Sequence, residues 1–169
     1  MSINEFTDLD ISGNIVKDLN YHGLTKPMPV QSKTIPQLIE GSDLIVESKT
    51  GTGKTLAFSI PIVEALDEGD AGVQALVITP TRELAEQVCG EIKKIGHTKR
   101  ISAQAFYGGK NIQTQAKKLE NGVDVVVGTP GRLLDLIRRR ILSLEQVKIL
   151  VLDEATACLT WDSSWTSKK

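Results

Sequence analysis

The chain has 169 residues, of which 40% are hydrophobic, and its formal charge is −1 at pH 7. This length and this apolar content are those of one domain with a core of ordinary size. A net charge so close to zero excludes a protein that attracts polyanions over its whole surface, so any nucleic-acid site must be a local patch.

The two cysteines, Cys89 and Cys158, lie far apart in the sequence. They indicate a reducing compartment and offer no metal site. The sequence contains neither an apolar run long enough to span a bilayer nor a signal-peptide core. We therefore expect an intracellular protein, cytoplasmic or nuclear, without a membrane partner.

Two helices are predicted in the first 41 residues. Ser12 is placed to cap the first of them, which carries three apolar residues on one face: Ile15, Val16 and Leu19. Gln31 begins the second helix after an extended, proline-containing stretch, and Gly41 ends it.

The segment 43–55 reads DLIVESKTGTGKT. Residues 43–46 have the composition of a buried strand, residues 48–53 form a glycine-containing loop, and Lys54 opens a helix that runs to Ala65. A strand, a glycine loop and a helix in this order are the context of a phosphate-binding loop. An ordinary glycine-rich turn is the plainer interpretation.

The residue types of this loop suit a polyphosphate. Gly51 and Gly53 allow the backbone N–H groups to turn inward around phosphate oxygens, and the helix that follows adds its own unpaired N–H groups. Lys54 is placed to reach the terminal phosphates and Thr55 to ligate Mg²⁺. The loop as a whole comprises Ser48, Lys49, Thr50, Gly51, Thr52, Gly53, Lys54 and Thr55. Ser48 stands where the usual signature has its first glycine.

Strands and helices alternate in the rest of the chain. The predicted strands are 73–78, 101–107, 123–127 and 147–152, and the predicted helices are 82–95, 111–119 and 132–139. Apolar strands that alternate with helices predict an α/β fold in which a mostly parallel sheet has helices on both faces. Ligands of such a sheet bind beyond the carboxyl ends of its strands.

Polar and glycine-containing turns follow the predicted strands. They are the loop after Val46, TPTR at 79–82, Gly108-Gly109, TPGR at 129–132, and Asp153-Glu154. At the end of a buried strand, Asp153 is placed to hold Mg²⁺, and Glu154 to orient and deprotonate an attacking water. One edge of the sheet is therefore expected to carry the chemistry.

Together these motifs resemble the first RecA-like domain of the DEAD-box ATP-dependent RNA helicases. The resemblance rests on SKTGTGKT at 48–55, PTRELA at 80–85, Gly108-Gly109, TPGR at 129–132, DEAT at 153–156, and GLTKPMPVQ at 23–31 with Phe6 upstream. It extends from about Phe6 to Ala155, and implies a RecA-like P-loop domain over 23–155, an N-terminal extension over 1–22 and an atypical tail over 156–169.

The resemblance implies a nucleotide site for ATP and Mg²⁺. Gln31 would read the adenine edge, because its amide donates and accepts at once; a solvated glutamine at a helix start is the plainer alternative. Leu24 stands where the family usually has a stacking aromatic residue, and Phe6 would support this region or simply cover a helix end. Lys26 belongs to the same motif. The implied catalytic residues are Lys54, Asp153 and Glu154, and the implied metal ligands are Thr55 and Asp153.

The resemblance also implies an RNA track that grips the sugar-phosphate backbone without reading bases. Its residues are Pro80, Thr81, Arg82, Gly108, Gly109, Thr129, Pro130, Gly131 and Arg132. Thr129-Pro130 is also an ordinary helix start, and the two interpretations are compatible. The run of three arginines at 138–140 is interpreted as a solvated helix end, with an extension of the track as the alternative.

The sequence departs from the family pattern after Ala155. Thr156 replaces the last Asp of DEAD, a Ser-Ala-Thr motif is absent, and no second RecA-like domain follows, so its arginine finger is missing. We therefore expect nucleotide binding with little ATPase and no unwinding from this chain alone. The missing strand would leave unpaired backbone groups in the sheet. We expect a compensation for this loss: residues 158–165 fill the gap, a second copy of the chain lends a strand, or the sheet closes up.

Two other functions remain open at this point. The chain would be a non-enzymatic truncated regulator that occupies RNA or a partner, or a different P-loop enzyme such as a kinase or a DNA-directed helicase. A kinase has no use for the Gln31, PTRELA and TPGR set. The DNA alternative is harder to separate, because backbone contacts distinguish RNA only through the 2′-hydroxyl and the duplex shape.

Overall fold

The computed structural model describes residues 3–49, 51–66 and 72–155. Its described residues form two compact units. The first contains the residues up to 66 together with Gly90–Ile101, and the second contains 72–89 and 102–155. Each unit is described by itself below.

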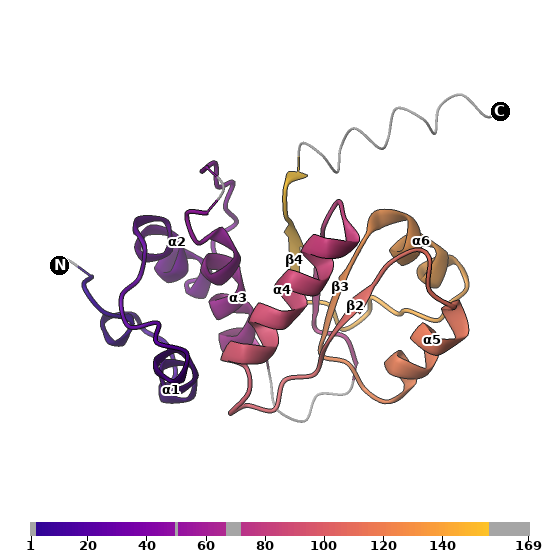
Figure 1. Cartoon of the computed structure of the whole chain (residues 1–169), viewed down its shortest axis with the longest axis horizontal. Helices are drawn as coiled ribbons and strands as arrows, with labels where there is room; N and C mark the ends of the chain where they lie inside the picture. Colours follow the sequence, from indigo (N-terminus) through magenta and orange to yellow (C-terminus); the bar gives the residue numbers. More distant parts are fainter. Residues whose placement is uncertain (1–2, 50, 67–71, 156–169) are drawn as a thin grey trace. The chain divides into compact units, whose positions relative to one another are not determined.

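The first unit is helical (Figure 1). It contains the short 3-10 helix η1 and three α-helices, with bounds Phe6–Asp8 for η1, Gly13–Tyr21 for α1, Pro29–Ile39 for α2 and Lys54–Ala65 for α3. Helices α2 and α3 pack against each other. The bounds predicted for α3 are confirmed, whereas α2 begins two residues before Gln31, with Pro29 at its first turn, where a missing N–H costs nothing.

Side chains from the loop after residue 95 hold the helices of this unit. The buried carboxylate of Asp18 on α1 accepts hydrogen bonds from the backbone N–H and the hydroxyl of Thr98, at 2.8 and 2.6 Å. Lys99 donates to the carbonyl oxygens of three residues at the end of α3: Val63, Glu64 and Leu66. A lysine there satisfies the carbonyl groups that a helix end leaves unpaired.

Ser12 stands at the N-cap position of α1, as predicted, but its hydroxyl makes no capping hydrogen bond. Instead, the Ser12 backbone N–H donates to the Glu64 carboxylate at 2.7 Å. The prediction of a side-chain cap was therefore wrong, because a carboxylate from another helix takes part in fixing this end of α1.

The strand predicted over 43–46 is not formed. The structure assigns no strand to residues 42–49, and Ile45 is fully exposed. A strand exists only where its N–H and C=O groups pair with a neighbouring strand. The described part of the first unit contains no strand with which this apolar segment could pair.

The second unit contains a parallel four-stranded sheet in the order β2-β3-β1-β4. The strands are β1 Ala75–Ile78, β2 Ala103–Phe106, β3 Val125–Gly128 and β4 Ile149–Leu152, and the helices are α4 Arg82–Ile95, α5 Ile112–Glu120 and α6 Pro130–Arg138. Residues of α4 up to Cys89 belong to this unit. The predicted parallel α/β fold is confirmed, and each strand is shorter than its apolar run.

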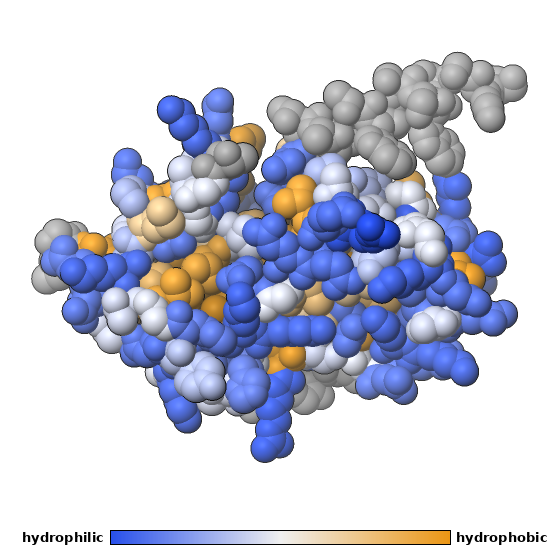
Figure 2. Space-filling view, viewed as in Figure 1, coloured by the Kyte–Doolittle hydropathy of each residue, from blue (hydrophilic) through white to orange (hydrophobic). Residues whose placement is uncertain are grey.

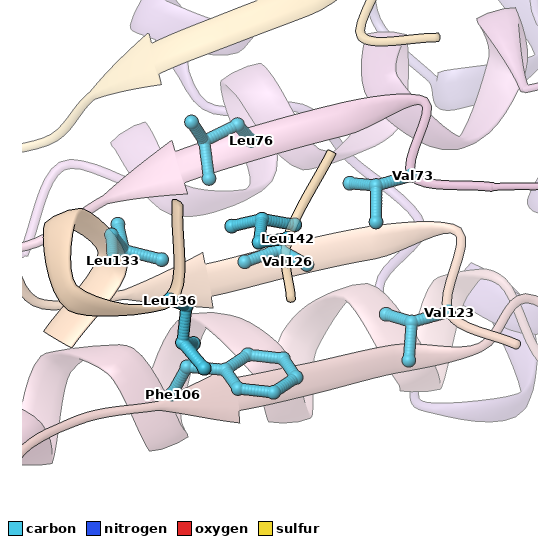
Figure 3. Packing of buried hydrophobic residues seen from close by; sticks show 8 residues of the cluster. All are labelled: Val73, Leu76, Phe106, Val123, Val126, Leu133, Leu136 and Leu142. Carbon is cyan, nitrogen blue, oxygen red and sulfur yellow. The ribbon is translucent and has the colours of Figure 1, made fainter. Parts of the chain in front are cut away.

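The core of the second unit lies between the sheet and the helices α5 and α6. Figure 3 shows eight of its buried residues. Leu76, Phe106 and Val126 project from three strands towards Leu133 and Leu136 of α6. The residues that alternate with them are buried too, so both faces of these strands are covered: Ala75, Val77, Ala103, Val125 and Val127. Continuous apolar strands of a parallel sheet require this double cover.

Strand β4 differs from the other three. Its residues alternate between half-buried and exposed, and Leu150 and Leu152 are 60% and 48% exposed. Its one partner among the described strands is β1. The expectation of a buried final strand was therefore wrong, because an apolar sequence does not by itself supply cover.

Most of the surface visible in Figure 2 is hydrophilic, and apolar residues appear there in small separate patches.

The segment 158–165 and Thr156, on which the prediction of a repaired sheet depends, lie outside the described residues. Among the described helices, none combines the length and the apolarity needed to cross a bilayer.

Candidate functional site

The second unit contains an open groove of about 490 Å³ at the carboxyl ends of its strands. Five residues of the predicted RNA track line it together with one residue that the sequence did not single out; they are Pro80, Gly108, Thr129, Gly131, Arg132 and Asp135. Three turns that lie far apart in the sequence therefore meet in one concave surface.

Parallel strands bring these turns together. The backbone N–H of Thr79, just after β1, donates to the carbonyl of Gly128, and the N–H of Thr129, just after β3, donates to the carbonyl of Phe106. Each bond extends the sheet by one residue beyond the end of its strand. The turns that follow these strands therefore leave the sheet side by side.

Two helices begin at these turns. The Thr81 hydroxyl accepts the N–H of Leu84 and so caps α4. Thr129 is the N-cap of α6, with Pro130 at its first turn, but the Thr129 side chain makes no cap hydrogen bond. The first N–H groups of a helix carry partial positive charge and suit a phosphate oxygen. The groove therefore offers backbone donors to an anionic ligand.

A glycine is required where α6 leaves the sheet. A Cβ atom added to Gly128 would lie 2.6 Å from the carbonyl oxygen of Phe106 and 2.8 Å from Leu133. The first contact is with the backbone of the adjacent strand, which cannot move without breaking the ladder. Gly128 therefore lets β2 and β3 approach closely just before the turn that lines the groove.

The Gly108-Gly109 turn is held by two side chains. Arg132 donates from both terminal nitrogens to the carbonyl oxygen of Lys110, at 3.0 Å each, and from Nη1 to Oε1 of Gln115 at 2.9 Å. Gln115 in turn donates to the carbonyl oxygen of Tyr107 at 3.1 Å. Gly109 has a φ of 86°, a conformation that favours glycine. Much of the Arg132 hydrogen-bonding capacity is thus directed at the protein itself.

Charged side chains surround the groove. Asp135 pairs with Arg139 at 2.7 Å. Lys110 lies 3.8 Å from the Glu86 carboxylate and 4.9 Å from the centre of the Tyr107 ring. A hydrogen bond and the charge interaction with Tyr107 raise the pKa of Lys110, so this side chain is a cation at neutral pH.

Arg82 is exposed, and its guanidinium pairs with Glu83 at 3.1 Å. The pKa of Glu83 is lowered, first by its own backbone N–H and then by Arg82. The three arginines at 138–140 are also exposed, at the end of α6. This agrees with the interpretation of a solvated helix end.

Sequence reasoning missed Asp135 and Gln115. Both had a signal. Asp135 follows Gly131 by four residues on a helix, so it projects from the same face. Gln115 is three residues after Ile112 and four before Leu119, which makes it a polar residue on the apolar face of α5, and it is 2% exposed.

The phosphate-type loop belongs to the first unit. Lys54 donates to the carbonyl oxygens of Ser48 at 2.5 Å and Lys49 at 2.9 Å, so its ammonium group lies against the loop that precedes it. The Ser48 and Thr52 hydroxyls are 2.8 Å apart. Thr50 lies outside the described residues. Thr55 is in the first turn of α3, half-buried.

Both glycines of the loop are needed. Gly51 and Gly53 have φ values of 78° and 84°. A Cβ on Gly53 would collide with Nε2 of Gln31 and lie 2.8 Å from the Met28 sulfur. The loop therefore has no room for a side chain here, and it offers a lysine, hydroxyls and the N-terminus of a twelve-residue helix. This donor set fits a phosphate group.

Gln31 connects the start of α2 to the glycine loop. It is 1% exposed, and its amide accepts from the N–H of Met28 at 2.8 Å and donates to the carbonyl of Gly53 at 3.0 Å. Its amide is thus bonded on both sides within the unit. Of the other predicted residues here, Phe6 is buried and its N–H donates to the Thr25 carbonyl, Leu24 is half-buried, and Lys26 is exposed.

Asp153 follows β4 directly. Its backbone N–H donates to the carbonyl of Ile78 at 2.9 Å, and its carboxylate accepts the N–H of Glu154 at 3.1 Å. Glu154 is exposed and has a φ of 50°, a left-handed conformation that costs energy for a residue with a side chain. Lys54 and Asp153 belong to different units, and their opposition across one nucleotide stays a prediction.

The family model described as DEAD/DEAH box helicase matches residues 28–169. The chain belongs to this family. The matched range extends past Ala155 to the end of the chain, and the expected domain bounds of 23–155 stay a prediction. The described turns that line the groove all fall within the matched region of the family.

Family members with high similarity come from several organisms. An ATP-dependent RNA helicase CshA of Listeria monocytogenes is 46% identical over 157 residues, which are 93% of this chain and 30% of the relative. The ATP-dependent RNA helicase FAL1 of Lodderomyces elongisporus is 43% identical over 155 residues, which are 92% of this chain and 39% of the relative. The chain thus spans about a third of the length of these relatives.

The fold agrees with the family assignment. The crystal structure of a DEAD box protein from the hyperthermophile Methanococcus jannaschii matches with a TM-score of 0.88 and 42% identity, over 94% of this chain and 44% of that one. The likeness covers the helical unit as well as the sheet, since it includes nearly the whole chain.

Proposed function

We propose that this chain is the ATP-binding and RNA-backbone-binding first domain of an ATP-dependent DEAD-box RNA helicase. The observation that carries the proposal is the groove in which Pro80, Gly108, Thr129 and Gly131 meet at the starts of α4 and α6. Glycines and helix N-termini let a sugar-phosphate backbone approach closely and find backbone donors. Such contacts carry no base information, so binding is sequence-independent.

Asp135 gives this groove a preference for RNA. It is a carboxylate in a site that otherwise favours anions, and a ribose 2′-hydroxyl is a donor that a deoxyribose lacks. Its pairing with Arg139 limits the repulsion of the phosphates. We therefore expect tighter binding of an RNA oligonucleotide than of the DNA strand of the same sequence.

The loop at 48–55 and the acidic turn at 153–154 would serve ATP and Mg²⁺. Lys54 and the first N–H groups of α3 would hold the phosphates, and Thr55 would ligate the metal ion. The metal role of Asp153, which belongs to the other unit, stays a prediction. Bound ATP with its metal supplies a phosphoryl group open to attack by water. Glu154 would orient that water and accept its proton.

Two partners complete the proposed function. RNA is the first, and the second is a second RecA-like domain, which the relatives are long enough to contain. Without an arginine finger from such a domain, hydrolysis is slower by about 10³–10⁵. This chain alone is therefore expected to bind nucleotide with little ATPase and no unwinding. The exposed Leu150 and Leu152 also leave self-association through β4 as a prediction, which light scattering would test.

Binding measurements test the proposal. A fluorescent ADP analogue with Mg²⁺ should bind the chain, and Lys54→Ala should weaken binding by about 10- to 100-fold, the effect of one lost charge-assisted hydrogen bond. Lys33→Ala, which removes an exposed lysine of α2, should not. A labelled single-stranded RNA should bind in low salt more tightly than the matching DNA. Equal nucleotide binding by wild type and Lys54→Ala, or no RNA binding, would refute the assignment.

A further inference from the structure

The turn that carries Gly108 and Gly109 is fixed at both of its ends. Gln115 donates to the carbonyl oxygen of Tyr107 before the two glycines, and Arg132 donates twice to the carbonyl oxygen of Lys110 after them. Between the two anchors, Gln115 also accepts from Arg132. One connected set of hydrogen bonds therefore spans α5, the turn and α6.

We propose that Gln115 is a positioning residue for RNA binding, which acts by holding the Gly108-Gly109 turn open to the sugar-phosphate backbone. The inference rests on the proposed function. Gln115 itself is 2% exposed, so it is not placed to contact RNA. It acts through Arg132, whose side chain lines the groove, and through the backbone of the turn.

The physical need for such a residue follows from the glycines. Two consecutive glycines lose more conformational freedom on ordering than any other pair of residues. Gly108 and Gly109 are both exposed, and a Cβ on either would meet no atom within 4 Å, so the turn is not restricted by close packing around these two residues. An unrestrained turn would have to be ordered by the ligand, which weakens binding.

Arg132 needs Gln115 for the same purpose. A guanidinium has five donors and no acceptor, and it can rotate among several arrangements. The Gln115 side-chain carbonyl, buried on the apolar face of α5, fixes the arrangement in which both terminal nitrogens reach Lys110. Glutamine suits the position because one side chain supplies the acceptor for Arg132 and the donor for Tyr107.

A second set of contacts lies beside this one. The Tyr107 hydroxyl donates to the Glu86 carboxylate at 2.5 Å, and Lys110 interacts with both groups. These contacts involve side chains at the two ends of the turn, whereas Gln115 and Arg132 bind its backbone. Loss of Gln115 therefore frees the backbone of the turn without removing the charges around it.

The test uses the 169-residue chain and three variants. Gln115→Met removes both hydrogen bonds at nearly constant volume. Gln115→Glu keeps an acceptor for Arg132 but loses the donor for Tyr107. Gln113→Met is the matched control, because Gln113 is an exposed glutamine two residues earlier on the same helix. A fluorescently labelled single-stranded oligouridylate is titrated at fixed salt. NMR relaxation gives the order parameters of the backbone amides, and hydrogen exchange gives their protection.

We expect Gln115→Met to weaken RNA binding by roughly tenfold, Gln115→Glu by less, and Gln113→Met not at all. The order parameters of Gly108, Gly109 and Lys110 should fall in Gln115→Met, while the amides of β3 stay protected from exchange and the affinity for a fluorescent ADP analogue is unchanged. A merely structural role would instead lower protection throughout the sheet.

The outcomes separate the two proposals. If wild type binds RNA and Gln115→Met binds it equally well, the role of Gln115 is overturned while the proposed function stands. Unchanged order parameters of the turn in Gln115→Met also overturn that role. If wild type itself does not bind RNA, the proposed function fails and the inference with it. Should Gln115→Met not fold, Gln115→Glu carries the same comparison.

Discussion

The side-chain amide of Gln31 donates a 3.0 Å hydrogen bond to the carbonyl oxygen of Gly53, the residue at which the glycine loop turns into α3. The same amide accepts the N–H of Met28 at 2.8 Å. One buried glutamine thus joins the start of α2 to the start of α3. A change in the conformation of the loop at Gly53 therefore changes the hydrogen bond of Gln31 directly.

Gln31→Met should therefore reduce both stability and nucleotide affinity. It keeps the volume and removes both hydrogen bonds. The N–H of Met28 is then left unsatisfied, at a cost of about 1–3 kcal/mol, whereas the Gly53 carbonyl still accepts the N–H of Ala57. Urea unfolding measures the stability, and titration with a fluorescent ADP analogue measures the affinity. Gln37→Met, an exposed glutamine of the same helix, should change neither by a comparable amount. Equal behaviour of the two variants would contradict the role of Gln31.

Lys99→Met should destabilise the first unit. The ammonium group of Lys99 satisfies the carbonyl groups of Val63, Glu64 and Leu66, at 2.8 to 3.3 Å, where α3 ends. Hydrogen bonds from a charged donor contribute about 1.5–3 kcal/mol. Thermal unfolding of Lys99→Met and of the control Lys93→Met, an exposed lysine of α4, gives the comparison. A melting temperature that falls only in the control would disprove the assignment.

Gly128→Ala should destabilise the second unit, whereas Gly90→Ala should not. The added methyl at 128 would lie 2.6 Å from a backbone oxygen of the neighbouring strand, and such overpacking costs about 1–3 kcal/mol. At Gly90, within α4, no atom lies within 4 Å of an added Cβ, so alanine should stabilise the helix by about 0.5–1 kcal/mol. We expect the denaturant midpoint to fall in Gly128→Ala and to rise in Gly90→Ala. A neutral Gly128→Ala would mean that the two strands separate there at little cost.

The turn that carries Phe6 should loosen in acid. The Asp8 carboxylate accepts the backbone N–H groups of Asn4 and Glu5, at 2.8 and 3.0 Å, and these bonds hold the pKa of Asp8 below its ordinary value of 3.8. A carboxylate with a lowered pKa stabilises the folded turn above the unfolded value, and this contribution is lost as the pH falls below 3.8 through the folded pKa.

NMR measures this effect through the amide of Phe6, which donates to the Thr25 carbonyl. Its chemical shift should titrate below pH 3.8 in wild type and lose this step in Asp8→Asn. Asp10→Asn, at an exposed position two residues later, should keep the step. A step that survives in Asp8→Asn would assign the titration to another group.

Local sequence determined the helices well. The bounds of α3 and α4 agree with their prediction, and Thr129-Pro130 and Asn111 start α6 and α5 as their residue types indicate. Each hydrogen bond of a helix joins residues four apart in the sequence. Capping residues and apolar periodicity within the segment therefore suffice to predict where a helix begins and ends. The motif residues at the ends of the strands were found for a related reason, since parallel pairing sends all those ends to one edge.

Tertiary structure alone decided the rest. Residues 43–46 have the composition of a strand and form none among the described residues, because a strand depends on a neighbour that composition does not reveal. The buried roles of Gln115 and Gly128, and the attachment of Arg132 to the backbone of Lys110, likewise depend on partners from other strands and helices. The sequence determines the chemistry of each side chain, but the atoms that the side chain contacts depend on how distant segments of the chain pack together.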